Sequence, residues 1–158
     1  MADTVIRNAT IIDGTGAQRF TGDVTIEDGH ISEVGSSSSA AAVEIDATGL
    51  VLAPGFVDVH THDDGALLQH PDMAFKISQG CTSVVVGNCG FSAIPAVPGD
   101  STLDLSGVQA NWSDLEGYRQ NVENSGPALN AMMLVGHNTI RSLEMGNERR
   151  APNDQELE

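Results

Sequence analysis

The sequence has few aromatic residues, few cations and two cysteines. Aromatic side chains make up 4% of the 158 residues, so aliphatic residues must supply most of the packing. Seven Lys and Arg stand against 22 Asp and Glu, and the formal net charge is −15. Because phosphate groups and anionic lipids repel such a surface, we expect no nucleic-acid partner and no membrane partner. Two cysteines are too few for a disulfide scaffold.

Long apolar runs are also missing. No stretch of about eighteen apolar residues is present, and residues 1–13 contain polar side chains throughout. The sequence therefore predicts neither a membrane span nor a secretory signal. We expect a cytoplasmic protein with reduced thiols. The chain is nevertheless long enough for a packed core.

Residues 1–54 predict a small all-β module of four to six strands. Residues 4–12 are rich in β-branched side chains. Apolar and polar residues alternate around Asp28 and Gly29, a dipeptide typical of a hairpin turn. Short apolar runs follow at residues 43–45 and 50–52.

The pattern changes at Gly55, and residues 55–158 predict parallel βαβ units. Two apolar runs are typical of strands buried on both faces, a third run also predicts a strand, and a helical pattern separates each from the next. Pro71 is expected to open the first helix, and a capping box at residues 113–116 the second. This alternation favours an α/β fold. The three predicted strands are residues 55–60, 82–86 and 128–135.

The last residues carry a further helix-start signal, with Asn153 as the cap. The signal comes just before the final residue, and three parallel strands leave a sheet with an open edge. We therefore expect an incomplete parallel barrel, since eight strands need about 250 residues.

Two histidines and one cysteine form a candidate metal site. His60 and His62 are two residues apart, which in an extended chain places both imidazoles on one face. Cys89 follows the next predicted strand, between glycines that allow close approach of the backbone. Imidazole and thiolate are preferred zinc ligands. The alternatives without a metal are a pair of surface histidines and a cysteine that only packs in the core.

Two weaker candidates could line the same pocket. Asp64 has the same parity as the two histidines and could orient an imidazole. His137 follows the third predicted strand, although a merely hydrogen-bonded histidine fits equally well. Lys76, the sole lysine, falls inside a predicted helix and not at a strand end.

Two segments resemble the amidohydrolase superfamily, and within it the D-aminoacylase (N-acyl-D-amino-acid deacylase) family. They are Gly-Phe-Val-Asp-Val-His-Thr-His at residues 55–62 and the segment 80–90, which contains Gly-Asn-Cys-Gly. Residues 6–14 and 136–141 fit as well. The resemblance implies a (β/α)8 barrel with a small β-sandwich built partly from the N-terminus. It also implies zinc-dependent hydrolysis of N-acyl-D-amino acids, a small-molecule substrate class, to a carboxylate and a D-amino acid.

The resemblance assigns roles to the candidate ligands. Family members bind zinc through a cysteine matched by Cys89 and through two later histidines, while His60 and His62 line a second, weaker metal position. The aspartate acting as general base is expected beyond residue 158, together with the remainder of the barrel. We therefore expect this chain to be inactive alone. The alternatives are a cyclic-amide hydrolase resembling dihydropyrimidinase or hydantoinase, which generally needs a strand lysine, and a non-catalytic truncated paralogue.

Overall fold

The computed structural model describes residues 2–96, 108, 110–146 and 148–157. The chain divides into two units, Met1–Pro54 and Gly55–Glu158. The boundary falls where the strand pattern of the sequence changes.

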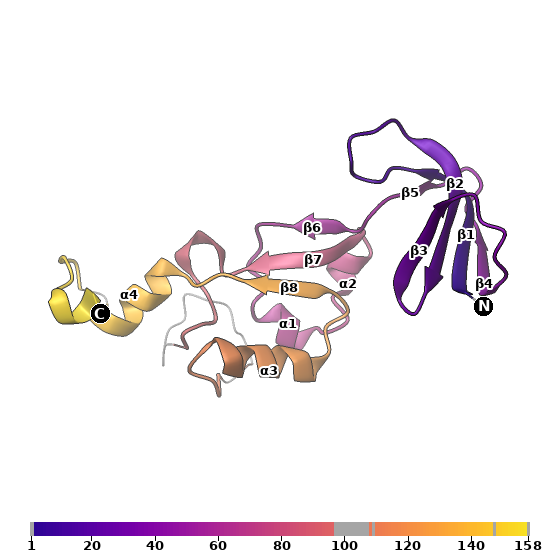
Figure 1. Cartoon of the computed structure of the whole chain (residues 1–158). Coiled ribbons are helices and arrows are strands. Elements are labelled where there is room, and N and C mark those ends of the chain that lie inside the picture. The colour runs from indigo at the N-terminus through magenta and orange to yellow at the C-terminus, as the bar shows by residue number, and fades with distance from the viewer. Residues whose placement is uncertain (1, 97–107, 109, 147, 158) are drawn as a thin grey trace. The chain divides into compact units, whose positions relative to one another are not determined.

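The first unit is a five-stranded sheet in the order β3-β2-β1-β4, with β5 also paired to β1 (Figure 1). Its strands are β1 (Ala2–Ile11), β2 (Phe20–Glu27), β3 (His30–Gly35), β4 (Ala41–Asp46) and β5 (Val51–Leu52). The β2–β3 hairpin turns at Asp28 and Gly29, which confirms the predicted turn. Both β4 and β5 run parallel to β1. The described sheet is therefore the predicted all-β module.

The second unit contains a three-stranded parallel sheet in the order β6-β7-β8 (Figure 1). Its elements in chain order are β6 (Phe56–Asp58), α1 (Ala66–Gln69), α2 (Ala74–Ile77), β7 (Cys81–Val86), the 3₁₀ turn η1 (Asn88–Gly90), α3 (Leu115–Ser125), β8 (Asn130–Met133), α4 (His137–Met145) and the 3₁₀ turn η2 (Asp154–Leu157). The predicted βαβ alternation is confirmed. Among the described residues, no helix has the length and apolar character that crossing a bilayer requires.

The core of the second unit lies between this sheet and the helices α1 and α3, which contact each other. Leu67 of α1, Val84 of β7 and Tyr118 of α3 are almost fully buried there. The Tyr118 hydroxyl donates to the Asp64 carbonyl at 2.8 Å, so its one polar atom is satisfied inside the core. This packing fixes the sheet whose strand ends carry the candidate ligands.

The helix expected to open at Pro71 is present as α2, but it begins only at Ala74. The carbonyl of Pro71 accepts a hydrogen bond from the backbone N–H of Ala128 at 2.7 Å, so this residue is tied to the start of the third βα unit. Met73 adopts a left-handed conformation with φ of 42°. Because such a residue is not part of a right-handed helix, the helix begins after Met73, and α2 is the single turn Ala74–Ile77.

Two further predictions need correction. β6 is not buried on both faces, since Phe56 is 62% exposed and the adjoining Val59 is 67% exposed. In the described part of the chain β6 pairs with β7 alone, so its other edge has no neighbouring strand.

The cap of α3 is Asp114 and not Ser113, because the Asp114 carboxylate accepts from the Gly117 N–H at 2.9 Å. The predicted cap Asn153 does accept two backbone N–H groups, but the turn it begins is 3₁₀.

Candidate metal centre

The carboxyl ends of β6 and β7 meet at one edge of the parallel sheet, where Asp58 pairs with Val84. The chain leaving β6 continues into the segment that holds His60 and His62. The backbone N–H of Thr61, between the histidines, donates to the Val85 carbonyl at 3.2 Å. The histidine segment therefore stays beside β7 after β6 itself has ended.

The three candidate ligands come together at this edge. The ligand atoms of His60, His62 and Cys89 all lie within 4.8 Å of one another. The Nε2 atom of His60 is 3.1 Å from the Cys89 Sγ atom, and the two imidazole centroids are 5.9 Å apart. All three residues are exposed, so their ligand atoms are accessible from solvent.

This donor set fits a zinc ion. Zinc–nitrogen bonds of 2.0–2.1 Å and a zinc–sulfur bond of 2.3 Å at tetrahedral angles place the two ligand atoms roughly 3.5 Å apart. The 3.1 Å between His60 and Cys89 is within a few tenths of an ångström of that spacing. Small side-chain rotations would be enough for both to coordinate one ion. Nitrogen and sulfur donors are also those that select zinc over calcium or magnesium.

The backbone of the Cys89 loop is held in an unusual conformation. Cys89 has φ of 56°, which few residues other than glycine adopt. Gly87 has φ of 82°, and a Cβ atom there would lie 2.2 Å from the Leu134 carbonyl oxygen. The Asn88 side-chain amide donates to the carbonyls of Val85 at 2.7 Å and Thr61 at 3.3 Å. These contacts join the cysteine loop to the histidine segment and turn the thiol toward His60.

Asp64 does not have the place predicted for it. Its side chain is buried, with 1% exposure. The two carboxylate oxygens accept from the backbone N–H groups of Gly87 at 3.3 Å and Ala93 at 3.1 Å. Burial raises the pKa of Asp64, and the bonds from Ala93 and Gly87 oppose that shift. Asp64 therefore ties both ends of the Cys89 loop from beneath, and it does not line an open pocket wall.

His137 belongs to a helix that contacts η1, the turn that carries Cys89. It is the first residue of α4 and is exposed. Together with Ile140, Arg141 and Glu156 it borders a hollow of about 210 Å³. His60, His62 and Cys89 do not border that hollow. That His137 lines the pocket of the three candidate ligands stays a prediction.

Sequence reasoning missed the contacts of Lys76. Its ammonium nitrogen lies 2.7 Å from Asp58 Oδ2 and 3.1 Å from Asp63 Oδ2. Burial lowers the pKa of Lys76, but the two carboxylates outweigh this effect and the net shift is upward. The hydrogen bond from Lys76 also lowers the pKa of Asp58. The sequence feature that could have indicated these ion pairs is the single lysine in a chain whose histidine pair is flanked by acidic residues.

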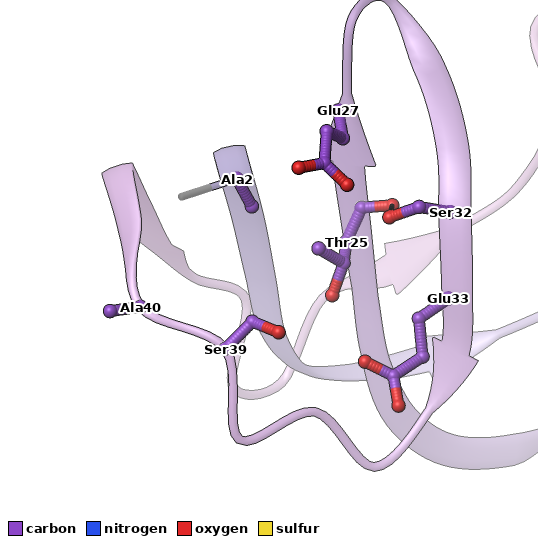
Figure 2. A pocket seen from close by; sticks show the side chains of 7 residues that line it. All are labelled: Ala2, Thr25, Glu27, Ser32, Glu33, Ser39 and Ala40. Atoms are coloured by element: carbon purple, nitrogen blue, oxygen red, sulfur yellow. Dashed lines mark hydrogen bonds between the residues drawn. The ribbon is translucent and has the colours of Figure 1, made fainter.

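A second hollow, of about 560 Å³, lies on the first unit (Figure 2). Figure 2 shows hydroxyl and carboxylate groups from β2 and β3 along it, with Ser39 from the following segment. Its lining residues are Ala2, Thr25, Glu27, Ser32, Glu33, Ser39 and Ala40. It lacks the histidine and cysteine donors found at the edge of the parallel sheet.

Curated relatives resemble this chain over almost its whole length. An N-acyl-D-aspartate deacylase of Alcaligenes xylosoxydans xylosoxydans is 43% identical over 98% of the chain. A D-aminoacylase of the same organism is 39% identical over 98% of the chain. The alignments cover 32% and 33% of these two proteins. The chain thus spans about a third of the length of the relatives it matches.

Solved structures agree with this resemblance. The crystal structure of an N-acyl-D-glutamate deacylase from Bordetella bronchiseptica, complexed with zinc and a phosphonate inhibitor, matches with a TM-score of 0.89 and 40% identity. A D-aminoacylase crystal structure matches with a TM-score of 0.91 and 39% identity. These matches cover 98% and 99% of the chain and 34% of each structure. The family model described as "Amidohydrolase family" matches residues 43–156. This chain therefore belongs to the amidohydrolase family.

Proposed function

We propose that the chain supplies the first third of a zinc-dependent deacylase that hydrolyses the amide bond of N-acyl-D-amino acids. The observation that carries the proposal is the cluster of His60, His62 and Cys89, whose ligand atoms lie within 4.8 Å of one another. The identities of 39–43% to three deacylases over 98% of the chain support the substrate class.

The proposal also predicts which part of the complete fold each sheet forms. We assign β6, β7 and β8 to the first three strands of a (β/α)8 barrel and the sheet of the first unit to part of a β-sandwich. The apolar side chains left exposed on and after β6 support the first assignment. A closed barrel fills its interior with such side chains. The residues concerned are Phe56, Val57 and Val59.

The chain's own residues would hold the metal and keep its ligands aligned. His60 and His62 would bind through neutral imidazole nitrogens and Cys89 through its thiolate, so binding releases the thiol proton. A bound zinc ion supplies Lewis acidity to a water nucleophile and to the scissile carbonyl. Asn88 and Asp64 hold the cysteine loop through their backbone contacts. We place the acid–base aspartate and the group that binds the substrate carboxylate in the remaining two thirds of the protein.

Lys76 does not have the features of the bridging lysine in a cyclic-amide hydrolase. Such a hydrolase would need a lysine at a strand end, free to become carboxylated and bridge two metals. Lys76 lies in α2, and its ammonium is paired with Asp58 and Asp63. A protonated, paired amine is not nucleophilic toward carbon dioxide, so Lys76 is unsuited to that role.

A chimera tests the proposal directly. Residues 1–158 would replace the matching first third of the D-aminoacylase. We expect the zinc-loaded chimera to hydrolyse an N-acetyl-D-amino acid and the same chimera with Cys89→Ala to lose turnover. A folded chimera that binds zinc but hydrolyses none of the N-acetyl-D-amino acids would contradict the proposed activity.

The chain by itself serves as the second arm of this test. We expect it to bind zinc without steady turnover of the same substrates, because the acid–base aspartate is supplied elsewhere. Steady turnover by the isolated chain, abolished by Cys89→Ala, would show instead that these residues form a complete site. Absence of zinc binding would favour the non-catalytic paralogue.

A further inference from the structure

We propose that Lys76 is a positioning residue that holds the His60–His62 segment in place for metal binding. This inference rests on the proposed metal site. It assigns a function to the chain's sole lysine, and it concerns the apo protein as much as the zinc-bound one.

The Lys76 ammonium lies beside both ends of the histidine segment. Lys76 extends from α2, which follows the histidine segment by twelve residues, back to the end of β6. There its nitrogen contacts Asp58 Oδ2 at 2.7 Å and Asp63 Oδ2 at 3.1 Å. Asp58 lies two residues before His60 and Asp63 one residue after His62. A single cation therefore joins the two ends of the segment that contains both imidazoles.

Hydrogen bonds connect Asp58 and Asp63 to the segment that carries the ligands. The other carboxylate oxygen of Asp58, Oδ1, accepts from the His60 backbone N–H at 3.3 Å. The backbone N–H of Asp63 donates to the Thr61 hydroxyl at 3.2 Å. The ammonium thus acts on the backbone of the segment from both directions. It does so without contacting an imidazole, as expected for a group that orients ligands from outside the metal site.

The two ion pairs are partly buried. The side chains of Lys76, Asp58 and Asp63 are only 18%, 30% and 19% exposed. Partly buried pairs are screened less by water and salt than surface pairs. In the described part of the chain, Asp63 Oδ2 is buried and has no hydrogen-bond partner of good geometry. Removal of the ammonium would leave two neighbouring carboxylates without their counter-charge, and their repulsion would open the segment.

The experiment compares three variants of the 158-residue chain. Lys76→Met removes the charge and keeps much of the aliphatic stem, and Lys76→Arg keeps the charge. Arg119→Met is the matched control, because it removes one positive charge from an exposed pair on α3. Zinc affinity is measured by competition with a chromophoric chelator. Hydrogen exchange of the metal-free protein is followed in a peptide spanning residues 58–64.

We expect Lys76→Met to weaken zinc binding by about 10- to 100-fold, the usual range for loss of a group that orients metal ligands. The same variant should speed exchange in residues 58–64 while exchange in α3 stays unchanged. Lys76→Arg should stay closer to the wild type in both measurements, and Arg119→Met should match the wild type.

Three results would overturn the inference. Wild-type affinity with wild-type exchange in Lys76→Met would show that the ammonium positions nothing. Tighter zinc binding in Lys76→Met would show that it only reduces the local negative charge. A wild-type chain that fails to bind zinc would contradict the proposed metal site, and in that case unchanged exchange in Lys76→Met overturns the positioning inference as well.

Discussion

The two units of this chain use sheets of different topology, and the difference explains where the chemistry lies. In the first unit the hairpin of β2 and β3 brings together groups that are close in sequence, such as those in Figure 2. In the second unit, parallel β6 and β7 end at the same edge. His60 and Cys89, 29 residues apart, therefore become neighbours at 3.1 Å. Convergence at the carboxyl ends of parallel strands creates the candidate metal centre.

The largest expected effect is a loss of zinc affinity when Cys89, but not Cys81, is replaced. Cys89→Ser should weaken zinc binding by at least about 1,000-fold, because hard oxygen replaces a thiolate ligand. Cys81→Ser is the matched control, since Cys81 begins β7 at the opposite end of that strand. Its zinc affinity, measured by isothermal titration, should remain that of the wild type. Equal losses of zinc affinity in both variants would contradict a metal site at the carboxyl ends of the strands.

Replacement of one glycine in each unit measures how strongly the local backbone conformation depends on glycine. Gly87→Ala should destabilise the chain by about 3 kcal/mol or more, because the new Cβ would meet the Leu134 carbonyl. Gly29→Ala, at the hairpin turn, should cost about 1 kcal/mol, since that position has a positive φ but open space around it. Urea unfolding of both variants measures the difference. Equal costs would mean that the Cys89 loop moves away from Leu134 easily.

Removal of a buried hydrogen bond should cost more stability than removal of an exposed one, but less than the clash at Gly87. Tyr118→Phe removes a buried bond to the Asp64 carbonyl and should cost about 1–2 kcal/mol. Thr48→Val removes an exposed bond to Asp46 in the first unit and should change stability by less than about 0.5 kcal/mol. Thermal unfolding of the two variants checks this order, and a larger loss in Thr48→Val would reverse it.

The smallest effect concerns a surface ion pair. Hydrogen bonds from Arg119 and then Gln120 lower the pKa of Glu116 from 4.5 to about 2. A depressed pKa in the folded state stabilises the protein above pH 4.5, and this contribution is lost as the pH falls toward 2. Glu116→Gln should therefore lower stability slightly at neutral pH and leave it unchanged near pH 2. Unfolding curves at both pH values test the prediction, and an equal loss at both would contradict it.

Local patterns predicted the elements of this fold better than their contacts. The hairpin at Asp28 and the parallel βαβ units followed from turn chemistry and apolar runs, which act over a few residues. The helix expected at Pro71 begins only at Ala74, because Met73 is left-handed and the Pro71 carbonyl is bound by the distant Ala128. The exposure of Val59 was missed because an apolar run does not show how many neighbouring strands are present.

The candidate site was predictable to the same extent. The spacing of His60 and His62 and the position of Cys89 after a strand identified three side chains that the structure brings together. Asp64 and Lys76 could not be placed, because their roles depend on loop geometry. Asp64 binds the backbone of a loop more than twenty residues later, and Lys76 reaches back across a turn to the end of β6. Parity along a strand carries no information about either contact.

X-ray absorption at the zinc edge, on the chain loaded with one equivalent of zinc, determines whether Cys89 and the two histidines bind the same ion. The account predicts one sulfur at about 2.3 Å and two imidazole nitrogens at about 2.0–2.1 Å, with the sulfur lost in Cys89→Ser and kept in Cys81→Ser. A spectrum with nitrogen and oxygen neighbours alone in the wild type would contradict it.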